Sequence, residues 1–181
     1  MDVEEVLKHE HQVINLMLDG IRRELTELRE VGTFDFAKLE KVLDFGRNFL
    51  DRCHHAKEEK YLFTRLEEKG QPEDHGLLAE LLAEHRQGRE HLAAISEAVP
   101  GAKGGDQKAL QAAAGHVRAY LELLTDHIDK ENEQLIPMTE RLLSQAEQEN
   151  VVQAFEEFET REIGPDVHEK YHALAHELAG R

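Results

Sequence analysis

Hydrophobic residues recur every three or four positions through four long blocks of the chain. A stripe with this period follows one face of an α-helix. The blocks are separated by segments that contain Gly or Pro, at Gly32, at 70–72 and at 100–105, and such segments interrupt helices. No block alternates apolar and polar residues over a useful length, and β-branched residues are sparse. The pattern therefore predicts an all-α protein with four long helices.

The connections between these predicted helices are short, at roughly 5–8 residues, which favours antiparallel neighbours. Four amphipathic helices bury their stripes best in an up-down-up-down four-helix bundle. Pro137 predicts a kink in the fourth helix. The residues from Asn150 onward indicate two short helices broken at Gly164-Pro165. We therefore expect a bundle over residues 1–145 and a short C-terminal helical extension, 146–181, that packs on it.

The composition narrows the possible partners. With 38 Asp and Glu against 22 Lys and Arg, the net charge is −16, which disfavours nucleic acids and anionic membrane surfaces because both need a basic stripe. The lone Cys53 cannot form an internal disulfide, and the N-terminus lacks the basic start and apolar run of a signal peptide. The apolar stretches are too short to span a membrane. We expect a cytoplasmic protein, and the sequence identifies no protein partner.

Histidine is unusually frequent, and four histidines interrupt the apolar stripes. The chain has 12 histidines, about three times the usual share of roughly 2%. Each half of the chain supplies one histidine from its first helix and a His-x-x-x-Glu motif from its second. The two histidines are 43 residues apart in the first half and 42 in the second. The six residues are His11, His54 and Glu58, followed by His85, His127 and Glu131.

The repeat favours a metal site. Taken singly, a His-x-x-x-Glu motif is more often a solvent-facing pair, and a histidine in an apolar stripe is usually a hydrogen-bonded core residue. Residues four apart share a helix face, so antiparallel halves would bring four histidines and two carboxylates into the core together. Two buried carboxylates repel unless a cation lies between them. Imidazoles with bridging carboxylates suit a pair of iron or manganese ions, of which we favour iron, whereas structural zinc sites are often rich in thiolates.

These motifs resemble those of the hemerythrin-like, or HHE, cation-binding domains. The resemblance covers about residues 1–145 and rests on Glu10-His11, the run 54–63, Glu84-His85 and the run 127–137, in the right order. It implies a four-helix bundle around a non-haem di-iron centre with two oxygen-bridged Fe ions. The same six residues would be the ligands, with both glutamates as bridges. The resemblance also implies a small diatomic or peroxide ligand.

One position departs from the oxygen-carrying hemerythrins, which supply a fifth histidine four residues after the third-helix histidine. This chain has Arg89 there, and His91 faces elsewhere on the helix. One metal position is therefore open or is filled by another side chain. The candidates are His55, Glu59, Tyr61, His168 and His172.

The candidates differ in the roles that we expect of them. For His55 and Glu59 we favour support of the ligands or partial exposure. His168 and His172, in the C-terminal extension, share one helix face and either cap the site or form a surface patch. Arg89 either steers an anionic or polarised ligand or forms a surface ion pair. The histidines expected on the surface are His9, His75, His116 and His176.

Three functions fit this centre. The first is binding of O2 or NO, the second is decomposition of hydrogen peroxide by a catalase-like enzyme, and the third is partner binding or iron storage without turnover. The absence of the fifth histidine weakens reversible oxygen carriage. We expect a non-haem di-iron protein that binds or reacts with O2, NO or hydrogen peroxide, and the other two functions stay as alternatives.

Overall fold

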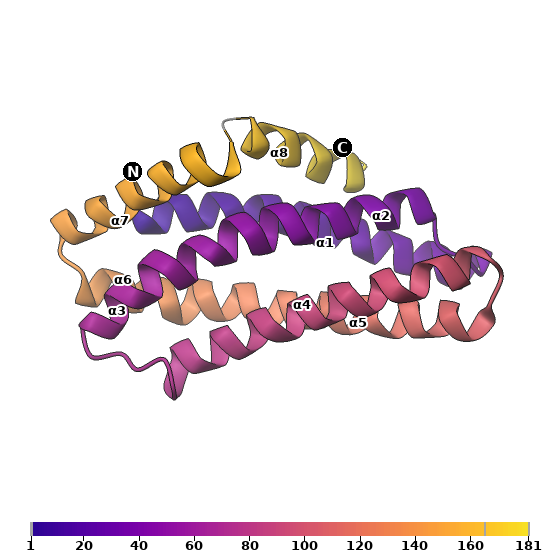
Figure 1. The fold of residues 1–181 in the computed structure, drawn as a ribbon, viewed down its shortest axis with the longest axis horizontal. Helices are drawn as coiled ribbons and strands as arrows, with labels where there is room; N and C mark the ends of the chain where they lie inside the picture. Colours follow the sequence, from indigo (N-terminus) through magenta and orange to yellow (C-terminus); the bar gives the residue numbers. More distant parts are fainter. Residues whose placement is uncertain (1, 165, 181) are drawn as a thin grey trace.

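The computed structural model describes residues 2–164 and 166–180, and its regular structure there is helical without strands. Four long helical segments run side by side, each antiparallel to the next (Figure 1). The first is α1 (Val3–Val31) and the third is α4 (Gly76–Lys103). The second and fourth are each composed of several elements. The predicted all-α bundle is confirmed.

The two composite segments contain π-helical turns. The second segment runs through α2 (Phe36–Phe45), π-helical η1 (Gly46–His55) and η2 (Glu58–Phe63), and α3 (Thr64–Glu68). The fourth runs through α5 (Gln107–Lys130), π-helical η3 (Glu131–Leu135) and α6 (Ile136–Leu142). A proline cannot donate a backbone hydrogen bond, so η3 lies directly before Pro137, where the sequence predicts an irregularity. The π-helical turns of the second segment have no such signal in the sequence.

Two boundaries differ from the sequence-based expectation. Helix α4 continues through Pro100 to Lys103, and the Gly104 N–H donates to the Pro100 carbonyl, so only the last turn accommodates the proline. The first helix of the extension begins at Gln145, whereas the sequence indicates helices only from Asn150 onward. It starts early because Ser144 caps the helix: its backbone N–H and its hydroxyl both donate to the Glu147 carboxylate.

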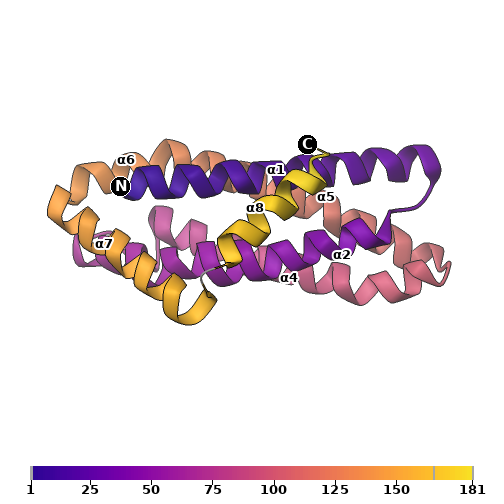
Figure 2. The ribbon, with the colours of Figure 1, turned by 90° about the horizontal axis from the view of Figure 1, so that it is seen from above.

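The extension lies across the outer face of the first two segments. It consists of α7 (Gln145–Phe158), π-helical η4 (Glu159–Ile163) and α8 (Val167–Leu178). Figure 2 shows α7 and α8 crossing α1 and the second segment. The break between its helices falls at Gly164, which has a φ of 103°. Pro165, the other half of the predicted break, lies outside the described residues.

A polar layer divides the hydrophobic core into two clusters. One cluster includes Met17, Phe45 and Tyr120, and the other includes Leu7 and Leu135. On each bundle segment, buried polar residues lie between the positions that supply the two clusters. Those polar residues include Glu10, His11, His54, His55, Lys57, Glu58, His85, His127 and Glu131. The polar residues of the sequence repeat therefore occupy the middle of the bundle.

The contact between α8 and α1 yields a first prediction. A Cβ atom at Gly20 would lie 2.8 Å from the Leu178 Cβ and 3.1 Å from the Leu178 carbonyl oxygen. Gly20→Ala should therefore weaken the docking of α8 by about 1–3 kcal/mol and increase amide hydrogen exchange in that helix. Gly115→Ala in α5 is the matched control, because a Cβ there meets no described atom within 4 Å. The control should stabilise by about 0.5–1 kcal/mol. Parent-like exchange of α8 in Gly20→Ala would contradict the prediction.

Candidate metal centre

The six predicted ligand residues lie together in the polar layer, and none is more than 2% exposed. Their donor atoms form two groups, within each of which one atom per residue lies within 4.8 Å of the others. The first group is His11, His54, Glu58 and Glu131, and the second is His85, His127, Glu58 and Glu131. Both groups contain the same two glutamates. The two carboxylates therefore lie between two pairs of histidines, one pair from each half of the chain.

The histidines present Nε2 to the two carboxylates. Glu131 receives His11 Nε2 at 3.1 Å from Oε2 and His127 Nε2 at 3.0 Å from Oε1. Glu58 lies farther from its histidines, with His54 Nε2 3.8 Å from Oε1 and His85 Nε2 3.6 Å from Oε2. Each carboxylate thus faces imidazoles from both halves, an arrangement suited to a bridge between two cations.

The outward Nδ1 atom of each histidine has an oxygen acceptor. The pairs, each at 2.8 Å, are His54 with Glu10, His127 with Glu84, His85 with Glu59, and His11 with Asn132. Such an acceptor holds the proton on Nδ1 and leaves the Nε2 lone pair directed inward, as a metal ligand requires. These bonds follow the repeat: Glu10 and Glu84 occupy equivalent positions, as do Glu59 and Asn132. The acceptors therefore fix the orientation of all four rings.

A further layer of lysines surrounds the acceptors. Lys57 forms ion pairs with Glu10 and Glu159, and Lys130, at the same position of the repeat, pairs with Glu84. The Lys57 side chain is fully buried because the extension covers it, with Nζ 5.4 Å from the centre of the Phe155 ring. The Lys130 side chain is 21% exposed. The covering by the extension makes the two halves of the site different.

The central carboxylates differ in acidity. Burial, and then the charge of Glu131, raises the pKa of Glu58 well above its usual range. Burial also acts to raise the pKa of Glu131, but His127, His11 and His54 hold it well below the usual range. Burial opposes the charged form of His54 and of His127, yet neighbouring carboxylates raise the pKa of each to about 10. In the metal-free protein, protons on these two rings therefore offset part of the negative charge.

The layer also contains buried polar atoms that make no hydrogen bond, although some of them lie close to an oppositely charged group. Among the described residues, nine buried side-chain nitrogen or oxygen atoms lack a hydrogen bond, and all except the Tyr120 hydroxyl lie in this layer. They are Nε2 of His11 and His54, both ring nitrogens of His55, and both oxygens of Glu58 and Glu131. Unpaired buried donors and acceptors destabilise a protein unless a ligand satisfies them. Inward-facing nitrogen and carboxylate atoms of this kind fit transition-metal cations.

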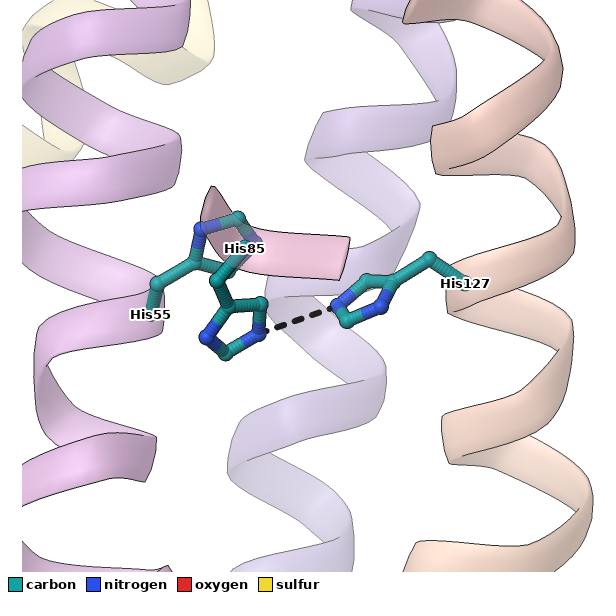
Figure 3. Close-up of side chains that lie close together, drawn as sticks. All are labelled: His55, His85 and His127. Atoms are coloured by element: carbon teal, nitrogen blue, oxygen red, sulfur yellow. Dashed lines mark hydrogen bonds between the residues drawn. The ribbon is translucent and has the colours of Figure 1, made fainter. Parts of the chain in front are cut away.

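The structure also places the other candidates. Arg89 donates to Asp51 from Nε and to Glu59 from Nη2, both at 2.6 Å, and its side chain is 38% exposed. It is therefore an ion-pair residue at the rim of the site. The ring of Tyr61 packs near Phe155 and Phe158 of the extension instead of joining either donor group. The rings of His55, His85 and His127 gather on one side of the layer (Figure 3).

The two candidate histidines of the extension, His168 and His172, lie in different surroundings. His168 is half-buried, with Nε2 3.5 Å from Glu10 Oε1 and 3.1 Å from Glu159 Oε1, so it contacts the acceptor of His54. His172 instead lies beside His9 and His176, where the three line a surface pocket of about 410 Å³. Only the first of the two predicted extension residues reaches the surroundings of the site.

The remaining predicted surface histidines are exposed or half-exposed. His75 is exposed and pairs with Asp74. His116 is half-buried, and its Nδ1 lies 3.1 Å from the Nδ1 of His91. Lys57, Lys130 and Asn132 were not predicted to belong to the site, although the two lysines occupy matching positions of the repeat and Asn132 matches the candidate Glu59. Glu159 was not predicted either, and no sequence signal exists for it because its contact depends on where the extension packs.

The fold and this cluster define an all-α bundle with buried His and Glu groups that could hold metal ions. The family model of the hemerythrin HHE cation binding domain matches residues 2–139, and the chain belongs to this family. The chain is also similar to uncharacterized protein Rv1995 of Mycobacterium tuberculosis and uncharacterized protein Mb2018 of Mycobacterium bovis. Each is 26% identical over 160 residues, which cover 88% of this chain and 62% of the relative.

This chain thus spans less than two-thirds of the length of those relatives. No solved structure shows a significant match. Among the described residues, no helix has the length and apolar character needed to cross a membrane.

The two lysines give a matched prediction. Lys57→Ala should destabilise the metal-free protein by about 3–5 kcal/mol, because it removes a cation from the buried Glu10 carboxylate. Lys130→Ala, the same change in the other half, should cost only about 1 kcal/mol, since that pair is partly solvated. Urea unfolding followed by circular dichroism measures both losses. Equal losses of stability in the two variants would contradict the prediction, because burial of Lys57 under the extension would then not strengthen its ion pair.

Proposed function

We propose that this chain is a non-haem di-iron protein that binds or reacts with O2, NO or hydrogen peroxide in the core of its bundle. One observation carries the proposal: two histidine pairs from opposite halves of the chain share Glu58 and Glu131 in a buried layer. Two cations held in this way would use the inward-facing Nε2 atoms and both carboxylates. The repulsion between the glutamates would then become a bridging interaction.

The donor chemistry supports iron. The site offers imidazoles and carboxylates, a set that suits iron or manganese pairs in helical bundles. Cys53 belongs to neither of the two groups that share the glutamates, and burial raises the pKa of its thiol to about 12, which disfavours the thiolate. A pair of iron ions, when bound, supplies redox chemistry and coordination of small oxygen- or nitrogen-containing molecules.

The surrounding residues determine what can reach the centre. The ligand residues are at most 2% exposed, so only a small molecule fits without large rearrangement. The Nδ1 acceptors orient the imidazoles and increase their basicity as ligands. The hydrophobic clusters on either side of the polar layer keep bulk water away. These features support a diatomic molecule or peroxide as the partner.

The test begins with the metal content per chain of protein expressed with added iron, and with its near-ultraviolet and visible spectrum before and after peroxide. About two iron ions per chain with oxo-to-iron charge-transfer bands would support the proposal. Rapid gas evolution on adding peroxide would favour turnover over binding alone. A single zinc ion or no metal would overturn it.

Loss of one histidine from each half tests the ligand assignment. His54→Ala and His127→Ala should each lose most of the bound iron, because each leaves Glu58 and Glu131 buried without enough cationic partners. His75→Ala, on the exposed loop side of α4, is the control and should keep the parent's iron content. Iron is measured by elemental analysis of purified protein. Parent-like iron content in both ligand variants would exclude this assignment.

A further inference from the structure

His55 is buried in the polar layer without a hydrogen-bond partner. It is 2% exposed, and neither ring nitrogen has a hydrogen bond among the described residues. Asp51 Oδ1 lies 3.8 Å from the Nδ1 atom, too far for a hydrogen bond. A buried imidazole in this state is unfavourable by about 1–3 kcal/mol for each unsatisfied group. A ligand that binds one of these nitrogens would remove part of this cost.

The ring lies beside one of the two histidine pairs. Its centroid is 3.7 Å from that of His85, with an angle of 13° between the planes, and 5.4 Å from that of His127. One nitrogen from each of the three rings lies within 4.8 Å of the others. Figure 3 shows the His55 ring next to the His85 ring, with the His127 ring facing both from another helix. No corresponding third imidazole joins His11 and His54 in the groups formed by the described residues.

The internal repeat explains this difference. His55 follows the histidine of the first His-x-x-x-Glu motif, and the residue at the same position of the second motif is Ile128, which is 1% exposed. Thus an apolar side chain fills the equivalent buried position in the second half. The two positions have similar burial but different chemistry, so packing alone does not require a histidine at residue 55.

Arg89 connects His55 to the departure seen in the sequence. Its guanidinium holds Asp51, which lies one helical turn before His55 and faces the His55 Nδ1 atom. The four predicted ligand histidines also have an oxygen atom on the Nδ1 side, there within 2.8 Å, and present Nε2 toward the centre of the layer. Arg89, which occupies the position of the absent fifth histidine, therefore fixes the Asp51 carboxylate beside His55.

We propose that His55 is the third imidazole ligand of the metal ion held by His85 and His127, whereas the ion held by His11 and His54 has two. This assignment rests on the proposed di-iron function. It makes the two ions chemically inequivalent and places the additional histidine on the second bundle segment. A purely structural role for His55, as a ring stacked on His85, is the competing explanation.

Two substitutions separate the roles of the ring and of its nitrogens. His55→Phe keeps an aromatic ring over His85 but removes both nitrogens, and His55→Ile copies the residue of the other half. Both should release one of the two iron ions to a ferrous chelator at least tenfold faster than the parent does. The ⁵⁷Fe Mössbauer spectrum should show two iron environments in the parent and lose one of them in the variants. Ile128→Val is the control, and should release iron as the parent does.

The outcomes are distinguishable. Parent-like chelator release and parent-like Mössbauer spectra in folded His55→Phe would overturn the assignment and leave the di-iron proposal standing. A parent that binds no pair of iron ions would overturn both. A crystal structure of the iron-loaded parent needs no variant: a His55 nitrogen within about 2.3 Å of a metal supports the assignment, and a longer separation excludes it.

Discussion

The close approach of Glu58 and Glu131 is the constraint on which the rest of the structure depends. Two fully buried carboxylates on opposing segments repel each other, and burial raises the pKa of Glu58 further. The surrounding side chains compensate this charge in successive layers. The four imidazoles come first, then the acceptors of their Nδ1 atoms, and then Lys57 and Lys130. The polar layer interrupts the hydrophobic core, so on each bundle segment some buried positions are occupied by side chains that compensate charge and not by apolar ones.

Much of this arrangement could be predicted from the sequence, because the information is periodic. The helical stripes place His11 and His127 on inner faces, and the matched spacing of the halves brings the six residues to one depth. Contacts that depend on how separate elements pack could not be predicted. The ion pair of Lys57 with Glu159 requires the extension to cross the bundle, and the stack of His55 on His85 requires two segments to approach at one height.

The halves of the repeat are related but not equal. The first half has a fully buried lysine and the cover of the extension, whereas the second has a partly exposed lysine. Glu59 carries a charge where the second half has the neutral Asn132, and it is also bound by Arg89. A charged acceptor strengthens the basicity of its imidazole more than an amide does. His85 and His11, which occupy equivalent positions, therefore differ as donors even before any metal ion binds.

These features link the occupancy of the centre to the stability of the fold. Without a cation, protons on His54 and His127 offset the carboxylates, and eight buried atoms of the layer stay unpaired. A metal ion bound at these Nε2 atoms would displace the protons, so its binding would become more favourable as the pH rises. Such an ion would bind the folded chain far better than the unfolded one, where the six side chains are dispersed, and would thereby stabilise the bundle by mass action. The polar layer that weakens the metal-free core is thus the part of the structure through which metal binding can hold all four bundle segments together.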